Sequence, residues 1–354
     1  MSYSEYVETV IDPALPIVDA HHHLWLLPEA TLAAMESQNS VVAQALAPTC
    51  RRRARYLLDE FLADVSDGHH IRSTVFVDAQ TMYRVSGPDR MKSVGEVEFV
   101  NGIGAAAASG VFGDVKVCAG IVGNVDLTLS DSVKEVLEAH LKAGGGRYRG
   151  VRCNGVVYDE DWTILGRGVG VPRLLCDERF RAGFRHLYPL GLSFDALILE
   201  PQLPDLIDLA RKFPDTSIIL NHLGAPLGVG KYSGQRQERF SLWRDRIREL
   251  ARSPNVFVKL GGFGIPFGGF STSVDGQPLT SSFLASEWKP YIESCIETFG
   301  PHRCMFESNF PVDSSICSYS VLWNAFKRIT AGASREEKSA LFSGTAQRVY
   351  RLEI

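Results

Sequence analysis

Several features that mark other protein classes are missing from this sequence. Its 354 residues contain no C-x-x-C pair, and the seven cysteines are an odd number, most of them within apolar runs. Reduced, buried thiols usually occupy such positions, so we expect a cytoplasmic protein without a disulfide framework. No basic segment precedes an apolar run at the N-terminus, and no uncharged apolar run reaches about 18 residues. Neither export nor membrane spanning is therefore predicted.

Positive charge is also scarce. Lysine and arginine number 37 against 41 aspartates and glutamates, which gives a formal net charge of -4. Without a basic field, binding to nucleic acid or to a membrane surface is not expected. The phosphate-binding patterns G-x-G-x-x-G and G-x-x-x-x-G-K-[ST] do not occur, so nothing indicates a nucleotide. The chain does have 45% hydrophobic residues, enough for a large globular core, and we expect its partner to be a small-molecule substrate.

Short apolar or β-branched runs alternate with helix-like segments along the chain, which is typical of βα units and a parallel sheet. Eight parallel strands favour an α/β fold of the (β/α)8 TIM-barrel type, forming a single domain over residues 1–354. A doubly wound sheet is the alternative, but it normally has a glycine-rich turn after its first strand, where this chain has histidines. The candidate strands are residues 17–23, 71–80, 115–123, 150–154, 192–199, 217–223, 255–262 and 303–310.

Three connections are long, namely residues 24–70, 81–114 and 261–286. In a barrel these βα loops follow the carboxyl ends of strands, where active sites are built. The third is rich in glycine and aromatic residues. It is either a flexible surface loop or a substrate lid with glycine hinges.

The strongest local signal is the run Asp19-Ala20-His21-His22-His23 at the end of the first strand. Period-two alternation places Asp19, His21 and His23 on one side, inward if Ile17 also points inward, and turns His22 the other way. Imidazole is a usual ligand of zinc and similar ions, so His21 and His23 are predicted metal ligands.

Two later strand ends carry related chemistry. His222 follows the buried run SIIL, and in a closed barrel it would approach the first pair. Glu307 and Asn309 share a face of the last strand, with Asp313 in the loop beyond. A carboxylate there could bind metal, contact substrate or act as a general base toward water.

Charged residues also occur within or next to apolar strands. Arg152 and Lys259 need a partner because burying an unpaired cation is costly. They would either bind a substrate carboxylate or an oxyanion, or form ion pairs with Asp195 or Glu307 inside the barrel. Glu200 follows the fifth strand at a rim position.

Together these segments resemble the amidohydrolase superfamily, in the branch that includes sugar lactonases and 2-pyrone-4,6-dicarboxylate lactonase. The resemblance extends from DAHHHLW through IILNHLG to RCMFESNFPVD. It implies that His21 and His23 form the H-x-H pair of strand one, that His222 is the strand-six histidine, and that the fold is a TIM barrel. Such barrels often pair, which leaves a homo-oligomer open.

Asn309 departs from the family pattern, because many members have at this place an aspartate that binds metal and activates water. A neutral amide cannot accept a proton from water, so Glu307 is the first candidate for a displaced carboxylate and Asp313 the second. Cys153 and Glu200 stand where close relatives often have histidine. Glu200 as an oxygen ligand would shift the metal preference from zinc toward manganese or iron.

Three functions follow from these residues. The first is a hydrolase that opens a lactone, or less readily an amide, of a small carboxylated or aromatic-derived metabolite, with the carbonyl polarised by a divalent metal or, without metal, by the histidines. The second is a metal-dependent decarboxylase or a non-haem iron oxygenase on the same barrel. The third is a non-catalytic binding relative that has lost its base at Asn309.

Overall fold

Eight parallel strands form one sheet that closes on itself in the computed structural model, which describes residues 8–271, 273 and 278–353. Each predicted strand segment overlaps one of them. Their order follows the sequence: β1 (Ile17–His22), β4 (Ile71–Val77), β5 (Lys116–Asn124), β6 (Tyr148–Arg152), β7 (Ser193–Ala196), β8 (Ile218–Leu220), β9 (Val256–Leu260) and β10 (Cys304–Phe306). The amide of Asn309 donates to His21 O at 2.8 Å, and the amide of His23 donates to Phe310 O at 2.7 Å. These bonds join the last strand to the first, so the fold is a (β/α)8 TIM barrel.

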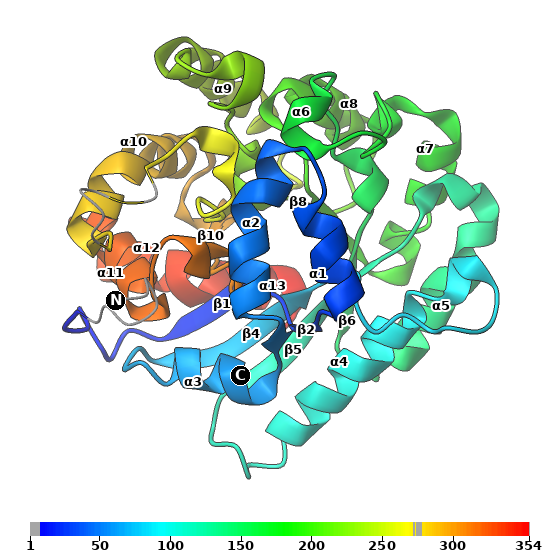
Figure 1. Cartoon of the computed structure of the whole chain (residues 1–354), viewed down its shortest axis with the longest axis horizontal. Coiled ribbons are helices and arrows are strands. Elements are labelled where there is room, and N and C mark those ends of the chain that lie inside the picture. Colours follow the sequence, from blue (N-terminus) through cyan, green and yellow to red (C-terminus); the bar gives the residue numbers. More distant parts are fainter. Residues whose placement is uncertain (1–7, 272, 274–277, 354) are drawn as a thin grey trace.

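Helices surround the strands on the outside of the barrel (Figure 1). Amphipathic patterning explains this position, because α8 buries Leu206, Ile207 and Ala210 on one face. Among the described helices, none combines the length and apolar character needed to span a bilayer. The outer helices are α4 (Val94–Ala107), α5 (Val133–Ala143), α7 (Glu178–Phe184), α8 (Leu203–Lys212), α9 (Arg236–Leu250), α10 (Ser281–Phe299), α11 (Tyr319–Ile329), α12 (Arg335–Ser339) and α13 (Thr345–Tyr350).

Side chains of a small apolar cluster fill the inside of the barrel below the site. Val18 and Ala20 of β1 pack there with residues of four other strands, and Tyr350 of α13 joins them. Ile17 belongs instead to the large cluster between strands and helices. The core therefore has an inner part and an outer part, and the side of the strand on which a residue lies decides which part it enters.

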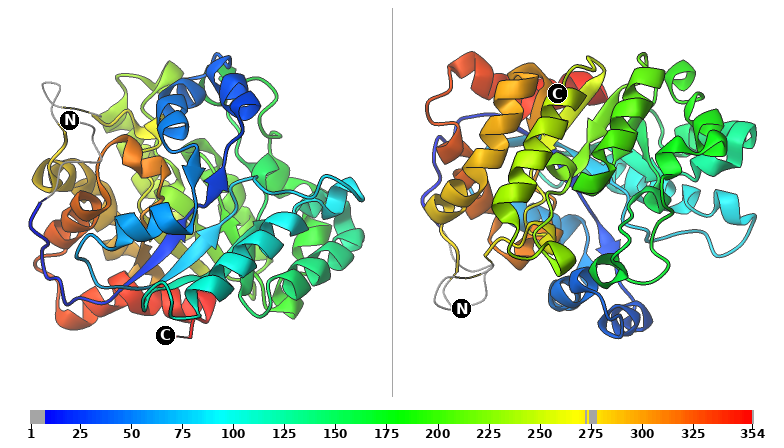
Figure 2. Two further views of the ribbon diagram at one scale, coloured as in Figure 1. Left: turned by 60° about the horizontal axis from the view of Figure 1, so that its bottom comes forward. Right: turned by 90° about the horizontal axis from the view of Figure 1, so that it is seen from above.

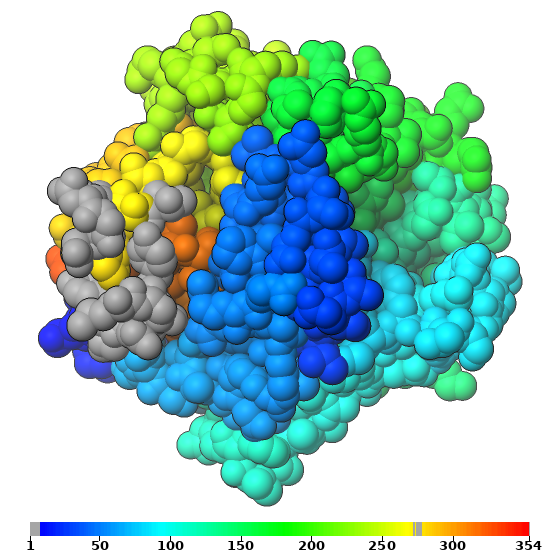
Figure 3. Space-filling model, in the orientation of Figure 1, coloured from blue at the N-terminus to red at the C-terminus, as the bar shows by residue number. Residues whose placement is uncertain are grey.

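The first long connection is built as a cap rather than as an open loop. It contains β2 (Trp25–Leu26), α1 (Glu29–Glu36), α2 (Val41–Arg52), β3 (Arg55–Tyr56) and α3 (Leu58–Val65). The cap helices α1 and α2 project from one end of the barrel, whereas the C-terminus lies at the other end (Figure 2). Figure 3 shows the same segment, in blue, across the centre of one face. Val42 of α2 packs on an apolar cluster of βα-loop residues that includes Ile164 of α6 (Trp162–Leu165), Leu227 and Phe267.

Candidate metal and catalytic site

His21 and His23, the first and third histidines of the run at the end of β1, point into the barrel, and both are buried. His23 Nδ1 lies 2.8 Å from the carbonyl oxygen of Val77, and His21 Nδ1 lies 2.8 Å from Glu307 Oε2. The Nε2 atoms of the two rings face each other at 3.3 Å. The middle histidine, His22, turns outward as predicted and stacks on Phe61, with ring centroids 4.1 Å apart.

Asp19 does not share the inward side, so that part of the prediction is wrong. Its carboxylate accepts hydrogen bonds from Ser308 Oγ at 2.6 Å and from Tyr319 of α11 at 3.1 Å, on the outside of the strand. The pairing of β1 with β4 shifts register between Asp19 and His22. This irregularity interrupts the alternation, so Ile17 and Asp19 face outward although His21 and His23 face inward.

The partners of the two rings determine where their protons lie. A carbonyl can only accept, so His23 Nδ1 carries the proton. His21 Nδ1 lies 2.8 Å from Glu307 Oε2 and 3.5 Å from the Lys259 ammonium, which can only donate, so its contacts do not select one tautomer. Burial, and for His21 also the charge of Lys259, lowers the pKa of both rings well below 6.5. Both are therefore neutral at pH 7, and the unprotonated Nε2 of His23 faces Nε2 of His21.

Asn309 adds an acceptor to this pair. Its Oδ1 lies 3.3 Å from His23 Nε2, and its Nδ2 donates to Asp313 Oδ1 at 2.7 Å, which fixes the orientation of the amide. Two acceptors, His23 Nε2 and Asn309 Oδ1, therefore meet beside His21 Nε2 in a buried space. Two ligands of a tetrahedral zinc ion lie about 3.4 Å apart, so the spacing of these atoms fits a divalent cation.

Glu307 lies between His21 and His222. Its Oε1 accepts from His222 Nδ1 at 2.8 Å and from the His222 amide at 3.2 Å. His222 belongs to η8 (Asn221–Gly224) and has a φ of 52°, a left-handed conformation that directs the ring into the barrel. His21, His222 and Glu307 offer ligand atoms within 4.8 Å of one another and form a second set that could hold a metal ion. Here, however, 2.8 Å contacts already occupy the facing atoms.

Three glycines of the segment after β9 (Val256–Leu260) make room for the site. An added Cβ at Gly261 would lie 2.5 Å from Glu307 Cγ, one at Gly262 would lie 2.1 Å from His222 Nδ1, and one at Gly264 would lie 2.6 Å from Asp313 Cα. These glycines permit close approach of the backbone, a packing role that the prediction of a loop or a lid with glycine hinges did not include. Residues 272 and 274–277 of the same predicted loop lie outside the described residues.

The variant Gly262→Ala tests this packing. Gly262 has a φ of +76°, so alanine combines a strained backbone with a collision against His222. We expect a loss of about 1–3 kcal/mol in the free energy of unfolding, measured with urea, and a drop of about tenfold or more in kcat.

Gly102→Ala is the matched control for this variant. Gly102 lies in α4 with nothing within 4 Å of an added Cβ, so alanine there should stabilise the protein by about 0.5–1 kcal/mol. Equal effects of the two substitutions would contradict the packing argument.

Both buried cations form ion pairs, which is one of the two predicted alternatives. Lys259 Nζ lies 2.7 Å from Asp195 Oδ1 and 3.5 Å from His21 Nδ1. Arg152 Nε lies 2.6 Å from Asp78 Oδ1, so its partner is neither Asp195 nor Glu307. Asp78 directly follows β4 in the run VFVDAQ, and its rim position is a signal that could have marked it in the sequence.

Glu200 lies apart from the histidine cluster. Its carboxylate pairs with Arg239 of α9, and the set of described residues that could hold a metal does not contain it. The structure therefore does not support the prediction of Glu200 as a metal ligand. A cation supplied 39 positions later in the chain cannot be anticipated from local sequence.

Glu96 stabilises the loop next to the Asp78–Arg152 pair. Its Oε1 accepts from the amides of Ala79 at 3.0 Å and Thr81 at 2.9 Å. Burial, reinforced by the charge of Asp78, raises the pKa of Glu96 from 4.5 to about 8. The folded protein thus holds this proton more tightly than the unfolded chain, and the stability that the protonated form contributes is lost as the pH rises from 4.5 through 8.

The variant Glu96→Gln removes this dependence on pH. We expect its free energy of unfolding, relative to the unmodified protein, to increase between pH 5 and 8, by at most about 1.4 kcal/mol per pH unit. Glu98→Gln on the same helix is the control, because the ion pair with Arg84 lowers the pKa of the exposed Glu98 instead. Parallel stability curves for the unmodified protein and Glu96→Gln would contradict the assignment.

A (β/α)8 barrel with inward histidines and carboxylates at the carboxyl ends of its strands defines a class of enzymes that act on a bound substrate with or without a metal ion. The comparisons agree with this class. A family model described as amidohydrolase matches residues 18–352. The chain therefore belongs to the amidohydrolase family, and it is an enzyme of that superfamily, in the branch that includes the lactonases.

Two relatives and one solved structure illustrate the similarity. The chain is 32% identical to uncharacterized protein y4mH of Sinorhizobium fredii, over 96% of this chain and 99% of that protein. It is 28% identical to L-fucono-1,5-lactonase of Burkholderia multivorans, over 66% of this chain and 72% of that enzyme. A structure of an amidohydrolase from Burkholderia multivorans with bound zinc has a TM-score of 0.70 and 25% identity, covering 95% of this chain and 99% of that one.

Proposed function

We propose that this protein hydrolyses a lactone of a small polar metabolite and that His21 and His23 hold a divalent metal through their Nε2 atoms. The observation that carries the proposal is the 3.3 Å approach of these two neutral nitrogens, with Asn309 Oδ1 a further 3.3 Å from His23 Nε2. The similarity to L-fucono-1,5-lactonase supports the substrate class. Nitrogen and amide-oxygen donors suit zinc or manganese. A divalent ion there supplies polarisation of the lactone carbonyl and a lower pKa for water.

Asp313 is the residue that we assign as the proton acceptor for water. One carboxylate oxygen accepts from Asn309, and the other, Oδ2, is buried without a hydrogen-bond partner among the described residues. Burial raises the pKa of Asp313 to about 8, close to the pH at which a general base works best. Asn309 then acts as a positioning residue that links Asp313 to His23.

Glu307 has a different role in this proposal. Because its two oxygens lie 2.8 Å from His21 Nδ1 and His222 Nδ1, it orients the two rings, and its hydrogen bond with His222 keeps that Nδ1 atom protonated. His222 then presents its ring to the substrate carbonyl. Of the two cations, Arg152 remains 6% exposed and is the one we place against the substrate, whereas Lys259 is fully buried.

Metal analysis combined with a substrate panel tests the proposal. Protein prepared without a histidine tag or chelators is examined by inductively coupled plasma mass spectrometry and assayed with sugar lactones and 2-pyrone-4,6-dicarboxylate, using a pH indicator. We expect about one equivalent of zinc or manganese and acid release from at least one lactone. Full lactonase activity after exhaustive chelation would contradict the metal but keep the reaction, since the histidines could then polarise the carbonyl themselves.

One observation favours a second candidate, the decarboxylase. The neutral amide of Asn309 occupies the position where hydrolysis needs a base, and a decarboxylase does not have to activate water. Release of CO₂ from an aromatic carboxylate, without opening of any lactone, would replace the proposal. Iron with oxygen consumption would instead identify the two-histidine, one-carboxylate set of His21, His222 and Glu307 as the working site.

The variant Asn309→Asp tests whether Asn309 takes part in the reaction or stands where a catalytic base has been lost. It would place a second carboxylate against Asp313, where Asn309 Nδ2 now donates at 2.7 Å, and the repulsion should impair the base. We expect kcat for the lactone to fall about tenfold, with binding of metal retained. A large gain of hydrolysis would show that Asn309 is a lost base and that Asp313 does not act.

A further inference from the structure

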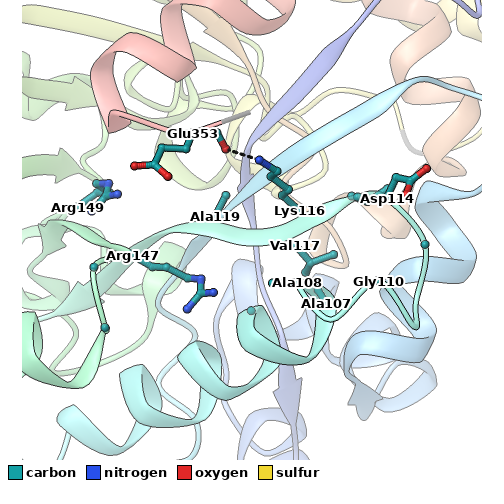
Figure 4. A pocket seen from close by; sticks show the side chains of 15 residues that line it. Ala107, Ala108, Gly110, Asp114, Lys116, Val117, Ala119, Arg147, Arg149 and Glu353 are labelled. Atoms are coloured by element: carbon teal, nitrogen blue, oxygen red, sulfur yellow. Dashed lines mark hydrogen bonds between the residues drawn. The ribbon is translucent and has the colours of Figure 1, made fainter.

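A pocket of about 590 Å³ lies at the amino ends of β5 and β6, opposite the catalytic end of the barrel. Lys116 begins β5, and Arg147 and Arg149 lie at the start of β6 (Figure 4). Glu353 and the end of α4 complete its wall. The proposed lactonase reaction uses none of these residues.

The three cations of this basal pocket have no carboxylate partner within ion-pair distance in the described part of the chain. Lys116 Nζ donates to the backbone oxygen of Glu353 at 3.1 Å, and Arg147 donates to Asn101 Oδ1 at 2.7 Å. Arg149 donates to two backbone carbonyls, and its Nε is buried without a partner among those residues. Donors therefore remain available for a ligand.

Like charges lie close together at this pocket. Burial, together with the neighbouring Arg351 and Arg147, lowers the pKa of Arg149, although the charge of Glu353 acts in the opposite direction. Two carboxylates also line the pocket, and neither is within ion-pair distance of these cations among the described residues. Figure 4 shows Glu353 on the side of Arg149 and Asp114 at the far end. A bound anion would offset the repulsion among the guanidinium groups.

The floor of the basal pocket consists largely of residues with little or no side chain. Gly104, Gly145 and Gly146 line it together with Ala107 and Ala108. Arg147 lies across Gly104, where an added Cβ would come within 3.1 Å of its Nε. The absence of side chains at these glycines thus leaves room for the pocket, and at Gly104 it leaves room for Arg147.

We propose that the basal pocket binds a phosphorylated small metabolite, with the phosphate on Arg147, Arg149 and Lys116. Guanidinium groups bind phosphate oxygens in a fork, and a dianion matches three cations better than a single carboxylate does. The volume exceeds what a phosphate alone needs and lies in the range of small-molecule sites. The glycine and alanine floor accommodates the organic part.

Titration calorimetry with pyrophosphate as the probe tests this site in the full-length protein. We expect saturable binding that Arg147→Gln with Arg149→Gln weakens about tenfold or more, and that Lys116→Gln weakens to a smaller extent. Arg252→Gln, a surface arginine outside the pocket, should leave the affinity unchanged. Circular dichroism confirms that each variant is folded.

Four results would overturn the proposal. The first is equal affinity of the unmodified protein and the double arginine variant, and the second is the absence of saturable binding. The third is loss of binding in His21→Ala with His23→Ala, which would place the anion at the catalytic end instead. Citrate serves as a comparison, and binding of citrate in preference to pyrophosphate would also reject the phosphate.

Discussion

Replacement of His23 by alanine is expected to lower kcat for the lactone about a thousandfold, which corresponds to about 4 kcal/mol of transition-state stabilisation. His23 Nε2 lies 3.3 Å from both His21 Nε2 and Asn309 Oδ1, so its removal takes away the shared member of the proposed ligand set. Bound metal should fall well below one equivalent in the same preparation. Metal analysis and initial rates on one sample provide the measurement.

His22→Phe is the matched control for this variant. His22 is the neighbouring histidine, but it stacks on Phe61 outside the strand, and burial lowers its pKa to about 3. A phenyl ring keeps the stacking on Phe61 but loses the 2.8 Å contact of His22 Nε2 with Thr74 Oγ1, so stability should fall. Metal content and kcat should stay within about twofold of the unmodified protein. Retention of metal and activity in His23→Ala, or their loss in His22→Phe, would refute the assignment of His23.

The variant Lys259→Met is expected to lose about 3–5 kcal/mol in the free energy of unfolding. Lys259 and Asp195 are both fully buried and lie 2.7 Å apart. Without the ammonium, Asp195 keeps only neutral donors, Asn221 Nδ2 at 3.0 Å and the Tyr350 hydroxyl at 2.8 Å, and its Oδ2 already has no partner among the described residues. An uncompensated charge then remains inside the barrel.

The double variant Lys259→Met with Asp195→Asn distinguishes this cause from loss of packing. Because the amide is neutral, the double variant should be more stable than Lys259→Met alone, and urea denaturation of all four proteins gives the coupling between the two sites. Additive losses, with no recovery in the double variant, would mean that the lysine stabilises the barrel mainly through its hydrocarbon chain.

The spacing and composition of the short apolar runs were sufficient to predict the strands. Each of the eight predicted segments overlaps a strand of the barrel because buried parallel strands are short apolar runs, and this pattern does not depend on distant residues. The convergence of His21, His23 and His222 could also be predicted from the sequence, since the carboxyl ends of barrel strands meet around one axis. The same rule would have added Asp78, which follows β4 directly.

The parts that sequence could not supply depend on residues distant in the chain or on local irregularity. Asp19 turned outward because the register shifts within β1, and strict alternation cannot reveal a bulge. Glu200 pairs with Arg239 and Arg152 pairs with Asp78, choices that only the folded chain determines. The glycines after β9 looked like hinges because sequence does not show which side chains will press against them.

Within the cap, the part formed by residues 24–57 has a consequence for how substrate choice could change in evolution. It is one contiguous stretch that leaves the barrel after β1 and returns through α3, and Arg52 Nη2 donates to Ser314 O at 3.0 Å, next to Asp313. A different cap could therefore be exchanged at two junctions while every strand and every inward histidine stays in place. Recombination of this segment among relatives offers a route to new substrates that leaves the folding of the barrel itself untouched.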